Sequence, residues 1–181
     1  DISEQISTAG LEASGTSNMK FMVNGALTLG TMDGANIEIV EEAGAENAVI
    51  FGLTADEIAT IEKNHSYNPQ EYLDRNPALA KVINQLVDGT YDPTHQLFRE
   101  LHDSLVYGIE GNRADVYYVL ADFDSYCKAQ DKFDELYQDR MNWAKMTLIN
   151  IANSGKFSSD RTIEDYVKDI WHLKKLPRAS K

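Results

Sequence analysis

The chain has 181 residues, which is enough for one domain with a sizeable hydrophobic core. Its 17 basic and 29 acidic residues give a net charge of −12, which argues against nucleic acid or an anionic membrane surface as a partner, because both are polyanions. The single cysteine, Cys127, leaves no disulfide pair within one chain and favours a reducing, cytoplasmic setting. No apolar run approaches the roughly 18 residues that a membrane span requires.

The chain opens with residues 1–5 (DISEQ), which contain neither an initiator methionine nor a targeting pattern. We expect the chain to be a proteolytic or engineered fragment that begins in the middle of a domain. Residues 1–18 are small and polar, include Gly10 and Gly15, and are predicted to form a loop.

The next residues, up to residue 65, alternate between helical patterns and short apolar runs. The predicted order is a helix from Asn18 to Gly25, a strand over 26–32, a helix over 35–43, a strand over 48–52 and a helix that begins at Thr54. The helix over 35–43 is indicated by Ile37 and Val40 at helical spacing, and Thr54 with Glu57 forms a capping box. Because strands and helices alternate, residues 1–65 are predicted to form a βαβα unit with a parallel sheet.

From residue 66 to residue 181 the sequence is predicted to be mainly helical. Asn68 and Pro69 suit the N-cap and first position of a helix expected to extend through residues 71–88. Further helical patterns follow around Leu97, Leu101 and Leu105, over 115–137, around Trp143 and Met146, and over 159–172, before a polar tail at 174–178. Trp143 and Met146 share a helical face and are expected to pack in the core. The fold class is therefore α/β, and the chain is expected to form a single partial domain.

Residues 12–20 (EASGTSNMK) have the clearest chemical potential. Their small side chains let the backbone approach a ligand closely. If a helix starts near Asn18, the N–H groups of residues 15–17 lie at its positive end and form a cradle for phosphate. Lys20 would lie one turn into that helix, where its amine can bind phosphate or form a Schiff base. Glu12 can accept hydrogen bonds from hydroxyl groups.

On residue types alone, other interpretations of this stretch stay open. Serine and glycine clusters are usually plain loops, and a lone lysine is usually solvated. A P-loop is excluded because Thr16 stands where its lysine must be, although Gly10 and Gly15 have the right separation. A metal site is not expected, because the histidines have no ligand spacing and no cysteine cluster beside them. These histidines are His65, His95, His102 and His172.

Residues 12–20 also resemble the cofactor-lysine motif of the glycogen/starch phosphorylase family, usually written EASGTxNMK. Residues 1–10 (DISEQISTAG), 24–36 (NGALTLGTMDGAN) and 155–162 (GKFSSDRT) resemble the same family in the same order, and the similarity extends to about residue 173. Ser17 stands where many members carry glycine. The resemblance implies the C-terminal part of a Rossmann-like glycosyltransferase-B domain, followed by a helical C-terminal region.

The resemblance further implies an activity and a cofactor for the longer enzyme. Members are pyridoxal-phosphate-dependent transferases of glycogen degradation and carbohydrate metabolism, which cleave an α-1,4-glucan with phosphate and release glucose 1-phosphate. Lys20 is implied to hold pyridoxal phosphate as an imine, while the phosphate of the cofactor serves in proton transfer. Gly15 and Thr16 are implied to help hold the cofactor and substrate phosphates. The residues implied to contact hydroxyls of the glucosyl unit are Glu12, Ala13, Ser14 and Gly15.

In the family, further phosphate-binding residues and most sugar-binding groups lie upstream of the matched region. We therefore expect the chain alone to be inactive, whereas its ability to bind the cofactor stays open. The alternative, from a different class of function, is a folding or association fragment without chemistry. Its amphipathic helices at 71–88 and 159–172 would then expose apolar faces and favour self-association.

Overall fold

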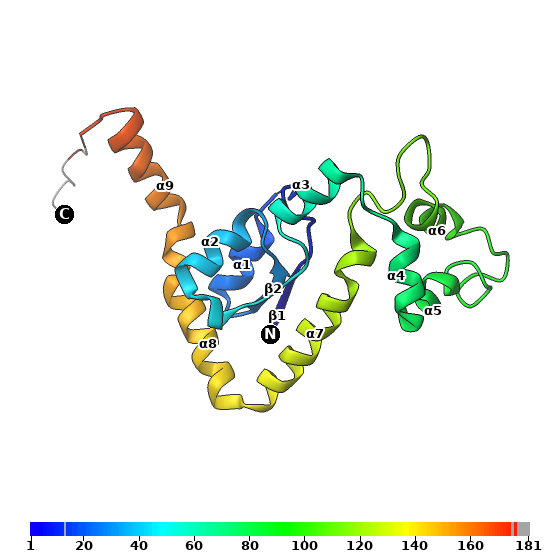
Figure 1. The fold of residues 1–181 in the computed structure, drawn as a ribbon. Coiled ribbons are helices and arrows are strands. Elements are labelled where there is room, and N and C mark those ends of the chain that lie inside the picture. The colour runs from blue at the N-terminus through cyan, green and yellow to red at the C-terminus, as the bar shows by residue number, and fades with distance from the viewer. Residues whose placement is uncertain (13, 175, 177–181) are drawn as a thin grey trace.

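The structure is a computed structural model, and it describes residues 1–12, 14–174 and 176. Within these residues, three parallel strands form a sheet in the order β1 (Ile2–Gln5), β2 (Leu27–Thr31) and β3 (Val49–Phe51) (Figure 1). The register pairs Ile2 with Leu27 and Leu29 with Val49. Helices α1 (Ser17–Val23) and α2 (Gly34–Ala43) connect successive strands. The prediction of an α/β chain with a small parallel sheet is confirmed.

The prediction that the whole of 1–18 is a loop is wrong for residues 2–5, which form β1. Their side chains give little local preference for a strand. Pairing with the apolar strand β2 supplies the backbone partners, so the tertiary context determines the conformation. Ser3 is buried in this strand, and its hydroxyl accepts a hydrogen bond of 3.0 Å from the Gln5 side chain.

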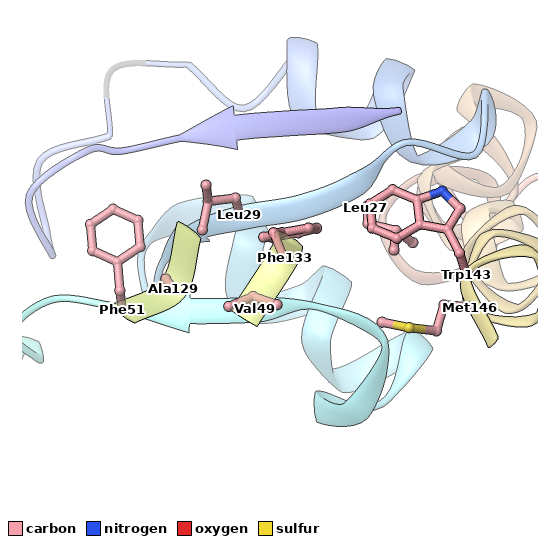
Figure 2. Close-up of a cluster of buried hydrophobic side chains, with 8 residues drawn as sticks. All are labelled: Leu27, Leu29, Val49, Phe51, Ala129, Phe133, Trp143 and Met146. Atoms are coloured by element: carbon pink, nitrogen blue, oxygen red, sulfur yellow. The ribbon is translucent and has the colours of Figure 1, made fainter. Parts of the chain in front are cut away.

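One face of the sheet packs against α7 (Val119–Gln138) and α8 (Arg140–Asn153), which form a V beside it (Figure 1). The buried side chains that join these elements are Leu27, Leu29, Val49, Phe51, Ala129, Phe133, Trp143 and Met146 (Figure 2). The rings of Phe133 and Trp143 meet edge to face at 5.7 Å between centroids. The prediction that Trp143 and Met146 belong to the core is confirmed.

Helices α1 and α2 contact each other and build a second buried cluster of Met22, Ile39 and Ala43. Although Ile37 and Val40 lie at helical spacing, neither belongs to this cluster, because Ile37 is 37% exposed and Val40 is only partly buried. The buried residues of α2 are Ala35, Asn36, Ile39 and Ala43. A polar residue lies on the inner face because the ends of the strands offer it hydrogen-bond acceptors.

The helical half begins with α3, whose capping box between Thr54 and Glu57 is present as predicted. The helix expected over 71–88 is in fact two helices that meet at Asn76, where φ is −124° and ψ is 97°. Pro77 causes the break, because a proline disfavours the helical conformation of the residue before it. The helices in the first part of this half are α3 (Ala55–Asn64), α4 (Pro69–Arg75), α5 (Pro77–Gln85) and α6 (Arg99–Val106).

Helix α7 begins at Val119 rather than at residue 115, the predicted start of its pattern. Asp115 is buried ahead of the helix, and its carboxylate accepts hydrogen bonds from the N–H groups of Val119 and Leu120 at 2.9 and 2.8 Å. Asp115 therefore supplies acceptors to the helix start from outside the helix. Leu79, Ile83 and Leu120 pack together where α5 meets α7.

The end of the chain is α9 (Ser159–Asp165) followed by a π-helical turn, Tyr166–Ile170, rather than one regular helix to residue 172. Figure 1 shows α9 extending away from the sheet and its covering helices. Ile163, Ile170 and Trp171 are exposed, as predicted for the apolar face of 159–172. The same prediction for 71–88 is wrong, because Leu79 and Ile83 are buried against α7. Most of the predicted polar tail lies outside the described residues. No helix in the described part of the chain is long and apolar enough to cross a membrane.

Candidate functional site

The loop that leads from β1 into α1 lies at the carboxyl ends of the strands, the edge where parallel sheets bind ligands. Asp33, which follows β2, is buried and holds this loop. Its Oδ1 accepts from the Gly10 N–H at 2.6 Å, and its Oδ2 accepts from the Ser7 hydroxyl at 2.8 Å. On sequence alone, Asp33 was assigned no role of its own, so this anchoring role was missed.

The carboxylate of Glu12 lies at the start of α2. Its Oε2 accepts from the Ala35 N–H at 2.8 Å, and its Oε1 accepts from Asn18 Nδ2 at 3.2 Å. Glu12 thus supplies the acceptor that the N-cap residue Asp33 does not provide, because Asp33 is engaged with the loop. The predicted role of Glu12 toward hydroxyl groups uses the lone pairs that these two bonds leave free.

The N–H groups of Gly15, Thr16 and Ser17 have no hydrogen-bond acceptor among the residues that the structure describes. Thr16 is the N-cap of α1, and its side chain forms no capping bond. The Ser14 and Thr16 hydroxyl oxygens lie 3.2 Å apart on the exposed surface. Consecutive N–H groups without an acceptor at a helix start suit an anion, and within the described residues these three have that arrangement. Ala13, also named as a candidate, lies outside the described residues.

Lys20 lies one turn into α1, where its N–H donates to the Thr16 carbonyl at 3.3 Å. Its side chain is exposed and forms no ion pair with any described carboxylate. Since no described residue holds the amine, it is free to bind a phosphate or to react with a carbonyl group. The structure thus places Lys20, Gly15 and Thr16 together at the start of one helix.

Beside the loop is a shallow cavity of about 580 Å³, whose walls include Glu12, Glu38 and Glu41 but no lysine or arginine. Carboxylates accept hydrogen bonds and repel anions, so this cavity suits hydroxyl groups rather than phosphate. A phosphate at the loop would have to lie on the side of Lys20.

A second cavity, of about 540 Å³ and mostly apolar, lies where the β1–α1 loop meets the start of α7. Its lining residues include Ile6, Leu11, Phe51, Tyr117, Phe123 and Tyr126. Sequence reasoning missed this cavity, because its walls come from segments more than a hundred positions apart that only the fold brings together.

Asp122 is the acidic residue in the wall of this apolar cavity. Its Oδ1 accepts from the Leu53 N–H at 2.8 Å and thereby ties α7 to the end of β3. Burial raises the pKa of Asp122 to about 6, the charges of Asp115 and Glu57 act in the same direction, and the bond from Leu53 opposes them. Across the described ranges, no cluster of histidine, cysteine, aspartate or glutamate could hold a metal ion.

The fold and the site define a class of segment: a parallel α/β unit with a lysine beside N–H groups that have no acceptor among the described residues, at the carboxyl ends of its strands. Residues 1–173 match the carbohydrate phosphorylase family. The chain is 51% identical over 172 residues to the muscle form of glycogen phosphorylase from Mus musculus, which covers 94% of this chain and 20% of the relative. It is 51% identical over 174 residues to the liver form from Homo sapiens, which covers 96% of this chain and 20% of the relative. The chain therefore belongs to the carbohydrate phosphorylase family, and it spans 20% of the length of these relatives.

Proposed function

We propose that this chain is the cofactor-lysine segment of a pyridoxal-phosphate-dependent glucan phosphorylase, a glycosyltransferase. The longer enzyme would cleave an α-1,4-glucan with phosphate and release glucose 1-phosphate. The observation that carries the proposal is the exposed Lys20, unpaired among the described residues and placed one turn after the free N–H groups of residues 15–17. The names of the relatives, glycogen phosphorylases, support it. The sheet would then belong to a Rossmann-like glycosyltransferase-B domain, of which residues 1–181 are one part.

The residues present fit pyridoxal phosphate in two respects. The free amine of Lys20 is the nucleophile that an aldehyde requires, and the N–H groups of residues 15–17 suit the oxygens of a phosphate. Both features lie at the start of α1. When bound, pyridoxal phosphate supplies a phosphate group for proton transfer beside the substrate phosphate.

The other residues of the loop would orient the sugar. Glu12 is held by Ala35 and Asn18, so its carboxylate has a fixed direction before any ligand arrives. Together with the exposed hydroxyl of Ser14, it would bind hydroxyl groups of a glucosyl unit next to the acidic cavity. Fixed acceptors and N–H dipoles need little reorganisation, and this favours the transition state over the free substrate.

The chain alone is expected to be inactive. Two neighbouring phosphates carry several negative charges, whereas Lys20 is the only basic residue in the stretch 1–36 that holds the loop and the strand ends. The net charge of −12 adds an unfavourable field. The test is an assay of the purified chain with glucan, phosphate and added pyridoxal phosphate that measures glucose 1-phosphate. Turnover above that of the Lys20→Ala variant would contradict this prediction.

The role of Lys20 is tested separately from activity. The chain is incubated with substoichiometric pyridoxal phosphate, reduced with borohydride, and mapped by peptide mass. We expect the label to concentrate on Lys20 and to disappear in Lys20→Ala. Lys63→Ala, which removes another exposed helical lysine, is the matched control and should leave the label unchanged. Label spread evenly over the lysines would count against the proposal.

A second candidate function is association of the chain with itself, which exposed apolar side chains on α8 favour. Met141 and Leu148 are 80% and 67% exposed and line a groove of about 860 Å³. We expect light scattering to show oligomers that Leu148→Lys dissociates. Leu97→Lys is the matched control, because Leu97 is 72% exposed but lies outside this groove. A monomer at every concentration would exclude this function.

A further inference from the structure

A pair of buried amides lies beneath the β1–α1 loop. The side chains of Asn18 and Asn36 are 0% and 1% exposed. Asn36 Nδ2 donates to the carbonyl oxygens of Gln5 and Thr31, the last residues of β1 and β2, at 3.3 and 3.0 Å. Asn36 Oδ1 accepts from Asn18 Nδ2 at 3.1 Å. The ends of two strands are thus linked to α1 through one side-chain pair.

Asn18 extends this link to the loop. Its Nδ2 also donates to Glu12 Oε1 at 3.2 Å, and its Oδ1 accepts from the Met19 N–H at 3.0 Å. Backbone carbonyls can only accept, so Asn36 must direct its NH2 group toward the strands and its oxygen toward Asn18. Asn18 must then donate to both Asn36 and Glu12. Each amide therefore has one orientation that satisfies all of its partners.

The space around this pair is close-packed. A Cβ added at Gly30, in the middle of the sheet, would lie 2.8 Å from both Asn36 Nδ2 and the Gln5 carbonyl oxygen. The amide of Asn36 thus fills room that any larger residue at position 30 would occupy. Buried polar groups whose partners are all satisfied rigidify their surroundings, so this arrangement fixes the loop relative to the sheet.

We infer that Asn18 is a positioning residue for Lys20 and Glu12, an inference that rests on the function proposed above. Positions 18 and 20 are separated by about 200° around a helix, so an inward Asn18 directs Lys20 outward. The same amide holds Glu12 through a direct hydrogen bond. Asn18 therefore sets the orientation of the amine and of the carboxylate relative to each other.

The test replaces the donor by an acceptor of the same size. In Asn18→Asp a carboxylate faces Glu12 Oε1 and Asn36 Oδ1, so both donated bonds are lost. The matched control is Asn68→Asp, which introduces the same charge at an exposed N-cap that only accepts a hydrogen bond, from the N–H of Gln70. We expect Asn18→Asp to lower the borohydride-trapped label on Lys20 by about tenfold or more, and Asn68→Asp to leave it unchanged.

A second readout does not require the cofactor. In wild type we expect the backbone amides of residues 15–17 to have NMR order parameters near ~0.85, falling below ~0.6 in Asn18→Asp. The double variant Glu12→Gln/Asn18→Asp should recover part of this order, because the glutamine NH2 group can donate to the new carboxylate. If Asn18→Asp alone fails to fold, the double variant is compared with Glu12→Gln, which leaves Asn18 in place.

Three results decide the inference. Equal labelling of Lys20 in folded Asn18→Asp and wild type overturns it and leaves the proposed function intact. Absence of label on Lys20 in wild type counts against the proposed function in this chain. The order parameters then decide the inference alone, and unchanged values for residues 15–17 in Asn18→Asp overturn it.

Discussion

The contact between Gly34 and Glu12 allows a quantitative prediction. Gly34 opens α2 with a φ of +47°, and a Cβ at this position would overlap the Glu12 carboxylate. Gly34→Ala must therefore displace that carboxylate from the Ala35 N–H, besides forcing an alanine into a left-handed conformation. We expect this substitution to destabilise the chain strongly and to release the loop.

The magnitude follows from two contributions. A positive φ costs an alanine about 1–2 kcal/mol, and losing the hydrogen bond from Ala35 to a charged carboxylate costs about 1.5–3 kcal/mol. The lower backbone entropy of alanine in the unfolded chain offsets up to about 1 kcal/mol. Gly34→Ala should therefore lower the free energy of unfolding by about 2–4 kcal/mol, a large fraction of the 5–15 kcal/mol that is typical of a domain.

The assay is urea unfolding followed by circular dichroism. Gly111→Ala is the matched control, because Gly111 has a φ of +82° but no atom within 4 Å of the added Cβ. It isolates the backbone contribution and should cost less than about 2 kcal/mol. In a Glu12→Gly background, which also removes the Glu12 Cβ that lies 2.9 Å from the added Cβ, Gly34→Ala should approach the same small value, with a coupling of about 1.5–3 kcal/mol. Equal losses for Gly34→Ala and Gly111→Ala would refute this reasoning.

Three further predictions concern the core, the pH dependence and a helix cap. Phe133→Ala should lower the free energy of unfolding by about 3–5 kcal/mol because it empties the core beneath β2, whereas Phe21→Ala, at an exposed site, should cost less than about 1 kcal/mol in the same urea assay. The pKa of Asp122 in the folded chain is about 6, above the ordinary value of 3.8. Protonation of Asp122 therefore stabilises the fold at low pH, and this contribution to the free energy of unfolding is lost as the pH rises from about 4 to about 6. Because Asp122 is partly exposed, we expect the free energy of unfolding to fall by only roughly 1–2 kcal/mol between about pH 4 and about pH 7. Asp122→Asn keeps an acceptor for the Leu53 N–H and should abolish this fall in the same unfolding measurements. Thr54→Ala should cost about 1 kcal/mol and speed hydrogen exchange in the first turn of α3, with no change there contradicting the role of the cap.

Local signals were sufficient to predict several elements. The strand at Leu27–Thr31 and the start of α3 at Thr54 depend on apolar runs, glycines and capping side chains within a few residues. The break at Asn76 was also within reach, because the proline that causes it is visible in the sequence. Periodicity alone concealed it, since apolar residues continue at helical spacing on both sides of Pro77.

Other features depend on segments that are distant in the sequence. Residues 2–5 form a strand because β2 pairs with them, and nothing in their own side chains required it. Asn36 is buried on α2 because two strand ends supply acceptors for its amide. On sequence alone, Asp33 and Asn36 had no role at the loop, because only the fold brings them beneath it.

At the site, chemistry and resemblance contributed different parts. Residue types alone predicted a phosphate-friendly loop with an amine one turn into the following helix. In the structure, the N–H groups of residues 15–17 have no acceptor among the described residues. The family resemblance supplied the cofactor and the reaction. Neither source showed that Glu12 would already be bound to Ala35 and Asn18, because those bonds require α2 to begin beside the loop.

The side chains that hold the β1–α1 loop explain how its N–H groups can lack an acceptor. A flexible loop with unpaired N–H groups would turn them toward its own carbonyls or hydroxyls, because unsatisfied donors are costly to bury and readily find local acceptors. Here Asp33, Glu12 and Asn18 hold the loop backbone and the start of α2 with their polar atoms, while the N–H groups of residues 15–17 have no acceptor among the described residues and Lys20 is exposed. We therefore expect anion binding by the loop to depend on Asp33 and Asn18, two buried residues that hold the loop in place.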